Sequence, residues 1–311
     1  MPRAIIDLGT NTFNLLIFEP DRSSTEQIGL HIIHQEEIPV LLGKDGLERG
    51  VIGPEAFDRG LSALDRIMLV ARSHGVSEAK GFGCSTFRNA ANAKDLIRAA
   101  AERGIRIEVL AGGDEASIIL DGVRLAVPFT SKPALVMDIG GGSIEFILAT
   151  NKALMWKQSF EVGLTRVRER IPIGDPIGVD DELRVAEFFD AQLEPLWQII
   201  DRHEPHLLIG SAGSFESIAA MLSAIVNEQI QVDQRSYSFT TDRFEELKDR
   251  LFRLSREERS ASPGLPAHRV DTIIYAFIAI DRVLVASGIR DMAWSRYSLK
   301  EGAAIRELRN G

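Results

Sequence analysis

The sequence predicts an α/β protein made of two similar domains. A strand–turn–strand segment occurs twice, as AIIDLGTNTFNLLIFE at residues 4–19 and as ALVMDIGGGSIEFILAT at residues 134–150. Strand-like and helix-like patterns alternate after the first copy, and the alternation restarts with the second. The chain has 311 residues, 45% of them hydrophobic and 26% charged, which suffices for two globular domains. We expect domains at 1–123 and 124–311, with a C-terminal helix at about 300–311 that is able to pack back on the first.

In the first domain, helices are expected between the apolar runs. Pro54 suits the first position of a helix that reaches about His74. Asn89 or Asn92 is expected to cap the next helix, and a third begins near Asp114. Apolar runs predict strands at 4–9, 12–19, 25–37, 81–86 and 106–111.

The second domain repeats this alternation from residue 134. Pro195 should divide a helix-rich stretch at 181–203. Asp242 with Glu245, and Ser298 with Glu301, have the spacing of capping boxes, for a helix at 242–257 and for the last helix. An apolar helix at 269–287 is either a domain core or the face of a homodimer. The strands are expected in a hairpin at 134–149 and at 154–163 and 207–211.

The duplicated turns have the composition of phosphate-binding loops. Asp7 and Asp138 hold the same place in the two copies, and position 14, an Asn, aligns with Glu145. Glycine permits a close approach of an anion, and successive backbone N–H groups then converge on phosphate oxygens. Each copy alone is also compatible with an ordinary β-hairpin. The candidate phosphate-binding residues are Asp7, Gly9, Thr10, Asn11, Thr12, Gly140, Gly141, Gly142 and Ser143.

Charge and hydropathy exclude several classes of function. The net charge of −9, from 36 basic and 45 acidic residues, provides no general attraction for nucleic acid or for an acidic membrane. Acidic side chains beside a phosphate require a bridging cation, and we expect Mg²⁺. Apolar stretches are too short to span a membrane and no leader opens the chain, so we expect a soluble, cytoplasmic protein. The single cysteine, Cys84, excludes an intramolecular disulfide and is expected to be buried.

An ordered set of motifs along nearly the whole chain resembles one family. The motifs are IDLGTNT at 6–12, KDGL at 44–47, STFRNAANA at 85–93, AGGDEASIILDGV at 111–123, DIGGGSIEF at 138–146, VGLTRV at 162–167, GSAG at 210–213 and LPAHRVD at 265–271. Together they resemble the exopolyphosphatase and guanosine pentaphosphate phosphatase family, in the superfamily of actin, sugar kinases and heat-shock ATPases. The chain is similar to the short, two-domain form of this family. The resemblance therefore does not predict processive cleavage of long polyphosphate.

This resemblance implies a fold and an active site. The fold would be two ribonuclease H-like (actin-like ATPase) domains, each a mixed sheet flanked by helices, with the active site in the cleft between them. Glu115 matches the general base that activates the attacking water, although a helix dipole alone also favours a Glu there. Asp138 and Glu145 match the carboxylates associated with the metal. Glu145 alternates with apolar neighbours, so an exposed strand position is the simpler alternative.

Cationic side chains and a third glycine loop complete the candidates. Arg88 matches a phosphate-binding Arg of the family, and without that match it is more typical of an ion-pair residue. The loop from Gly210 to Ser214 opens a helix and is either a ligand contact or a plain turn. Possible substrate or nucleotide contacts are Arg166, Gly210, Gly213, Ser214 and Lys300.

Three functions remain open at this point. The first is a magnesium-dependent phosphohydrolase in which water attacks the terminal phosphoryl group of inorganic polyphosphate, of guanosine pentaphosphate, or of both. The second is a non-catalytic sensor of alarmone nucleotides. The third is an ATP-dependent kinase of the same superfamily, for which the second half shows no sugar-binding signature. In each case the expected partner is a small polyanion, and neither nucleic acid nor membrane is expected.

Overall fold

The computed structural model describes residues 1–21, 29–231 and 233–310, which form two compact units. The first unit contains Met1–Gly122, Gly140–Gly142 and Tyr297–Gly311, and the second contains Val123–Ile139 and Ser143–Arg296. Both ends of the chain therefore contribute to the first unit, and the chain leaves it within a helix, α4 (Gly112–Ala126).

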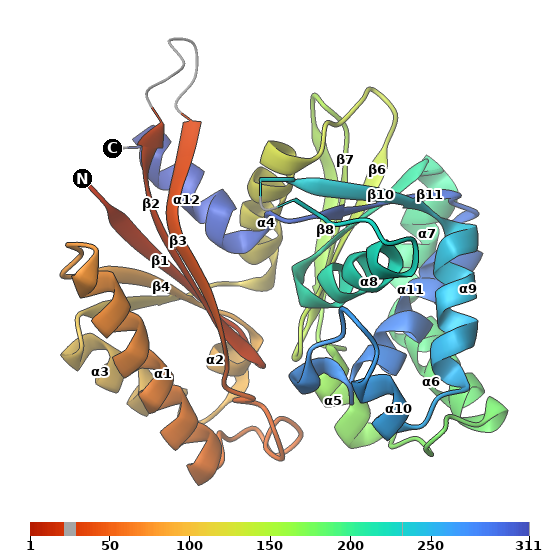
Figure 1. Ribbon diagram of the computed structural model, residues 1–311, viewed down its shortest axis with the longest axis horizontal. Coiled ribbons are helices and arrows are strands. Elements are labelled where there is room, and N and C mark those ends of the chain that lie inside the picture. Colours follow the sequence, from red (N-terminus) through yellow and green to blue (C-terminus); the bar gives the residue numbers. More distant parts are fainter. Residues whose placement is uncertain (22–28, 232, 311) are drawn as a thin grey trace. The chain divides into compact units, whose positions relative to one another are not determined.

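The first unit is built on a five-stranded mixed sheet with the order β3-β2-β1-β4-β5 (Figure 1). The β1–β2 and β2–β3 pairs are antiparallel, whereas β1–β4 and β4–β5 are parallel. Its strands are β1 (Arg3–Leu8), β2 (Thr12–Asp21), β3 (Gly29–Pro39), β4 (Ala79–Gly83) and β5 (Ile105–Val109).

Helices flank this sheet. Ile6 and Leu8 of β1 belong to a core with residues of α1, whereas the fully buried Ile5 lies outside that core. Successive strand residues point to opposite faces, so both faces of β1 are covered. On α12, a Cβ added to Gly302 would lie 1.8 Å from the carbonyl oxygen of Ile118, so α12 and α4 meet backbone to backbone. The helices are α1 (Pro54–Ser73), α2 (Ser85–Asn89), α3 (Ala93–Glu102), α4 and α12 (Leu299–Asn310).

The second unit repeats this topology. Its six-stranded sheet has the order β10-β11-β9-β6-β7-β8, in which β8-β7-β6-β9-β11 matches the first sheet strand for strand and in direction. The predicted pair of similar α/β domains is confirmed by this match. The strands are β6 (Ala134–Ile139), β7 (Ile144–Ala149), β8 (Leu154–Phe160), β9 (Leu207–Ser211), β10 (Ser236–Thr240) and β11 (Asp291–Ser295).

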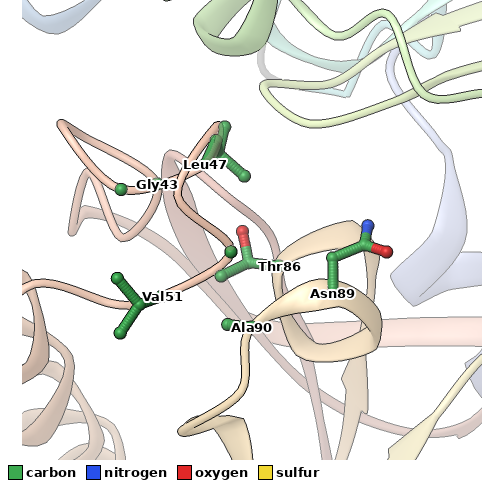
Figure 2. A pocket seen from close by; sticks show the side chains of 8 residues that line it. Gly43, Leu47, Val51, Thr86, Asn89 and Ala90 are labelled. Atoms are coloured by element: carbon green, nitrogen blue, oxygen red, sulfur yellow. The ribbon is translucent and has the colours of Figure 1, made fainter.

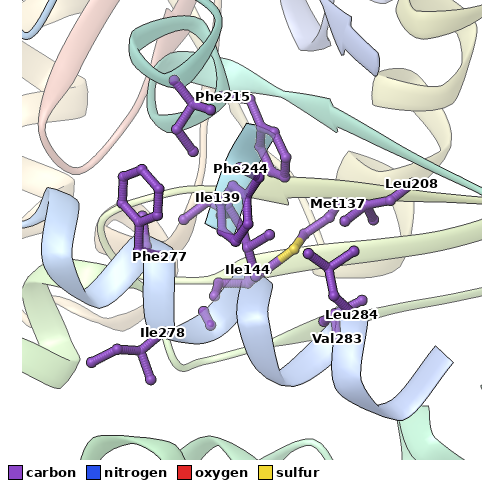
Figure 3. Packing of buried hydrophobic residues seen from close by; sticks show 14 of the residues in the cluster. Met137, Ile139, Ile144, Leu208, Phe215, Phe244, Phe277, Ile278, Val283 and Leu284 are labelled. Atoms are coloured by element: carbon purple, nitrogen blue, oxygen red, sulfur yellow. The ribbon is translucent and has the colours of Figure 1, made fainter. Parts of the chain in front are cut away.

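The core of the second unit centres on α11 (Ile273–Ser287). Figure 3 shows Phe277 and Val283 of this helix near Met137 of β6 and Phe244 of α9, all of which are buried. The apolar character of α11 is therefore explained by a domain core. The other helices are α5 (Leu164–Arg170), α6 (Val179–Gln192), α7 (Glu194–His203), α8 (Ala212–Ile225), α9 (Thr241–Phe252), α10 (Arg256–Ser260) and a 3-10 turn at Ala267–Arg269.

Several local predictions were wrong. The strand expected at 81–86 ends at Gly83, and Ser85 begins a short helix instead. Asn92 holds the N-cap position of α3, as expected, but its side chain does not cap the helix, because its amide forms hydrogen bonds with both backbone groups of Ile52 at 2.9 Å. The cap of α9 is Thr240, not Asp242, and this helix stops at Phe252.

Other differences concern strands. Strands β10 and β11 were not predicted, because SYSFT and DMAWS carry polar residues where an apolar run was sought. Part of the strand expected at 25–37 lies outside the described residues, and the rest is β3.

Candidate active site

The first glycine turn joins β1 to β2. Gly9 N donates to the carbonyl oxygen of Thr12 at 3.0 Å, and a Cβ on Gly9 would lie 2.9 Å from that oxygen, so the tight turn requires glycine. Asp7 and Asn14 are directly opposite in the β1–β2 register. Asn14 Nδ2 donates to Asp7 Oδ2 at 3.3 Å and to Thr12 Oγ1 at 3.2 Å. The carboxylate of Asp7 is thus oriented by its strand neighbour.

The second glycine turn joins β6 to β7 and presents a pair of carboxylates. Asp138 and Glu145 are directly opposite in the register, so their side chains lie on the same face of the sheet. Both are buried, with 7% and 1% of their surface exposed, and Glu145 is therefore not an exposed strand residue. Ser211 Oγ donates to Asp138 Oδ2, and Ser159 Oγ donates to Glu145 Oε1 at 2.7 Å.

This carboxylate pair has the composition of a magnesium site. Mg²⁺ is typically held by one or two carboxylates together with water and substrate phosphates. The described residues contain no cluster of three or more His, Cys, Asp or Glu that would enclose a metal by itself. Asp138 and Glu145 therefore fit an ion that the substrate helps to bind, and the metal stays a prediction.

Glu115 lies in the first turn of α4 and pairs with Arg88 at the end of α2. Arg88 Nη1 lies 2.5 Å from Glu115 Oε2 and also donates to the carbonyl oxygen of Leu110 at 3.1 Å. The two side chains are 16% and 7% exposed. The predicted base and the predicted phosphate-binding arginine are thus brought together in a largely buried ion pair, within one unit of the molecule.

Short helix α2 and Cys84, which directly precedes it, make two contacts that were not predicted. Thr86 and Thr10 join their buried hydroxyl groups at 2.9 Å. Cys84, which is buried as expected, donates from Sγ to Asp7 Oδ1 at 3.8 Å. A strand prediction through residue 86 concealed these contacts, although the hydroxyl-rich motif STFRN was itself a signal.

The candidates in the second unit are also engaged with neighbours. Arg166 Nη2 lies 3.1 Å from Glu161 Oε2. At the turn where β9 leads into α8, Ala212, the first residue of the helix, has a φ of 62°, which is rare for a residue with a Cβ. A Cβ on Gly213 would lie 2.2 Å from Arg269 Nη2, so the arginine packs directly on this loop. Arg269 was not among the predicted contacts, and its place in the LPAHRVD motif was the available signal.

The remaining loop residues line the start of α8. Gly210 has no room for a side chain, because an added Cβ would lie 1.9 Å from the ring of Phe215, and Ser214 is buried. Ala212 and Gly213 between them are only partly buried. A nucleotide contact there stays a prediction.

Lys300 lies at the start of α12. Its Nζ is 3.0 Å from Oε1 of Glu301, a carboxylate with no exposed surface. Gln35 Nε2 donates to the same oxygen at 2.9 Å, and Ser298 N donates to Glu301 Oε2 at 2.9 Å, as expected of a capping box. The lysine thus has a carboxylate neighbour.

The fold and these motifs define a phosphatase family. The profile of the Ppx/GppA phosphatase family matches residues 21–310, and the chain belongs to this family. Exopolyphosphatase 1 of Mycobacterium tuberculosis is 25% identical over 311 residues, which cover 99% of this chain and 88% of that protein. Exopolyphosphatase 2 of the same organism is 25% identical and covers 97% of both chains.

Solved structures agree with this assignment. A crystal structure of an exopolyphosphatase from Cytophaga hutchinsonii has a TM-score of 0.95 and 36% sequence identity, with coverage of 100% of this chain and 98% of that chain. The Aquifex aeolicus member of the Ppx/GppA family has a TM-score of 0.80 at 20% identity and shares the fold. The predicted fold class, two similar α/β domains with mixed sheets flanked by helices, is confirmed. Among the described helices, none has the length and apolar character needed to cross a bilayer.

Proposed function

We propose that this protein is a magnesium-dependent phosphohydrolase that releases orthophosphate from the end of a phosphate chain. The observation that carries the proposal is the buried pair Asp138 and Glu145, side by side at the end of a glycine turn. Two adjacent carboxylates repel a phosphate chain unless a cation lies between them. Bound Mg²⁺ would neutralise charge on the substrate oxygens, which is the main requirement of phosphoryl transfer.

The two turns would bind the phosphates next to the reacting group. In the first turn, the buried Thr10 N–H has no acceptor among the described residues, so a phosphate oxygen would satisfy it. In the second turn, Gly140, Gly141 and Gly142 carry no Cβ, so their backbone N–H groups would be able to approach phosphate oxygens closely. We also propose that the two turns bind one substrate from opposite sides.

Glu115 would orient and activate the attacking water. A general base has to accept a proton, which a carboxylate does and an amide does not. Arg88 holds this carboxylate from one side at 2.5 Å and thereby fixes its direction. In the complex, the same guanidinium would share its charge between Glu115 and a phosphate oxygen.

Inorganic polyphosphate is the favoured substrate, and guanosine pentaphosphate is the second candidate. Relatives that match nearly the full chain are named exopolyphosphatases, whereas the family name also includes the pentaphosphate enzymes. Both substrates present a terminal phosphoanhydride to the same groups.

A substrate panel tests this proposal. Orthophosphate release is measured from long-chain polyphosphate, tripolyphosphate, guanosine pentaphosphate and ATP, with Mg²⁺ and with excess chelator. We expect Mg²⁺-dependent release that is fastest from polyphosphate. Binding without release from any of the four would instead identify a sensor, and transfer from ATP to an added acceptor would identify a kinase.

A further inference from the structure

A segment between β3 and α1 lies directly against the first glycine turn. We call residues 40–51 the strap. Val40 N and Leu41 N both donate to the carbonyl oxygen of Asn11, at 2.8 and 2.9 Å, and Gly43 N donates to the carbonyl oxygen of Thr10 at 3.2 Å. A Cβ on Gly43 would lie 2.5 Å from Thr10 Cγ2. The strap therefore borders the backbone that is proposed to hold phosphate.

The other side of the strap contacts α2 and the residues that follow it. Ala91 N donates to the carbonyl oxygen of Gly50 at 2.8 Å. Figure 2 shows Gly43, Leu47 and Val51 of the strap across a narrow hollow from Thr86 and Asn89. The hollow is mostly apolar, so it suits packing of the strap better than binding of an anion.

The strap is held in a strained conformation. Leu41 and Asp45 have φ values of 45° and 56°, in the left-handed region that residues with a Cβ rarely adopt. Such strain persists only where surrounding contacts enforce it. Arg59 of α1 supplies them, because its Nε donates to the carbonyl oxygen of Val40 at 2.8 Å and its Nη2 to that of Leu41 at 3.1 Å. The position of the strap beside the turn is thus fixed at some energetic cost.

Lys44 is the cation that this arrangement brings to the turn. It directly follows Gly43, and consecutive Cα atoms are only about 3.8 Å apart. Its side chain is exposed and pairs with no carboxylate in the described part of the chain. Arg88 and Lys300, by contrast, pair with Glu115 and Glu301. Lys44 is therefore available to an anionic ligand.

We propose that Lys44 contacts the inner phosphates of a substrate whose terminal phosphates occupy the first turn, so that it sets the affinity for phosphate chains. The proposal rests on the proposed function. A lysine ammonium is a compact charge on a flexible stem, which suits successive phosphates of a chain that moves forward after each cleavage. Because the protein has a net charge of −9, attraction of a polyanion depends on such local cations.

Substitution of Lys44 tests this role. For Lys44→Ala we expect the KM for long-chain polyphosphate to rise about tenfold, which corresponds to about 1.4 kcal/mol, with kcat within about twofold of wild type. Added salt should raise the wild-type KM more than that of the variant, since one ion pair is missing. Lys44→Arg should restore most of the affinity. Lys94→Ala is the matched control, because Lys94 is exposed on α3 and is likewise without a carboxylate partner among the described residues.

A binding measurement separates failure of this inference from failure of the proposed function. Calorimetric titration with tripolyphosphate needs no turnover, and Lys44→Ala should weaken binding about tenfold where Lys94→Ala does not. If wild type binds tripolyphosphate but releases no orthophosphate, the proposed function fails. The titration then still tests whether Lys44 contributes to phosphate binding. Equal affinities and equal KM values for Lys44→Ala and Lys94→Ala would overturn the role of Lys44. Absence of any binding by the wild-type protein would overturn both proposals.

Discussion

At the residue scale, the two glycine turns differ most at one aligned position. Asp7 and Asp138 occupy the same place, but each has a different partner opposite it, Asn14 in the first turn and Glu145 in the second. The first pair is an amide donating to a carboxylate at 3.3 Å and needs no cation. The second pair is two buried carboxylates, which are costly to bury as anions unless a positive charge accompanies them. We therefore propose the metal site at the second turn alone.

Substitution of Glu145 should raise the magnesium requirement. We expect Glu145→Gln to increase the Mg²⁺ concentration at half-maximal activity by about tenfold or more, because one of two anionic ligands is lost. Ser159→Ala removes only the hydrogen bond to Glu145, so its effect should be smaller. Asn14→Ala is the matched control in the first turn and should leave the magnesium requirement unchanged. The assignment fails if Asn14→Ala and Glu145→Gln shift it equally.

At the element scale, Asp271 links α5 and α10 of the second unit, because it pairs with an arginine of each helix. It follows the 3-10 turn and accepts a hydrogen bond from Arg256 Nε at 2.6 Å, and it lies 3.4 Å from Arg168 Nη2 of α5. Burial acts to raise the pKa of Asp271, but the hydrogen bond from Arg256 and the charges of both arginines outweigh it and lower the pKa from its ordinary value of 3.8. The ionised form therefore stabilises the fold.

The free energy of unfolding should depend on whether Asp271 is ionised. A carboxyl group with a depressed pKa contributes stability that is present above its unfolded value of 3.8 and is lost as the pH falls through the folded value. We expect Asp271→Asn to lower the free energy of unfolding by about 1 kcal/mol at pH 7, with the difference shrinking below the unfolded pKa. Denaturant unfolding at several pH values measures it. Asp95→Asn, in the exposed pair with Arg98, should have little effect, and a pH-independent loss for Asp271→Asn would argue against the titration.

Element types and the internal repeat were predictable from the sequence, whereas several partners were not. The repeat rests on local residue order, so the correspondence of Asp7 with Asp138 and of Asn14 with Glu145 followed from alignment of the two copies, whereas the structure supplied the register that places each carboxylate opposite its partner. The pairing of Arg88 with Glu115 joins residues far apart in the chain, and no local pattern encodes it. Strand β11 was missed because a short central strand is stabilised by its neighbours more than by its own composition.

At the scale of the whole molecule, duplication explains how one chain supplies different chemistry from two similar units. In each sheet a glycine turn joins the first two strands of the repeated topology, with the same strand order around it. The second unit adds the carboxylate pair, whereas the first adds Glu115, Arg88 and the strap with Lys44. Under the proposed function, the carboxylate pair would provide the cation site, the turns the backbone donors, and Glu115 the oriented water that hydrolysis of a phosphate chain needs.

The most direct test of this account is single-turnover release of orthophosphate from polyphosphate by wild type and by Glu115→Gln, with Mg²⁺ present. Glutamine keeps the size of the side chain and still accepts the hydrogen bond from Arg88, but it does not take up a proton. We expect the variant to remain folded with a lower melting temperature, because Arg88 loses its ionised partner, to bind tripolyphosphate like wild type and to lose about 100-fold or more in rate. A folded variant that releases orthophosphate at the wild-type rate would contradict the account.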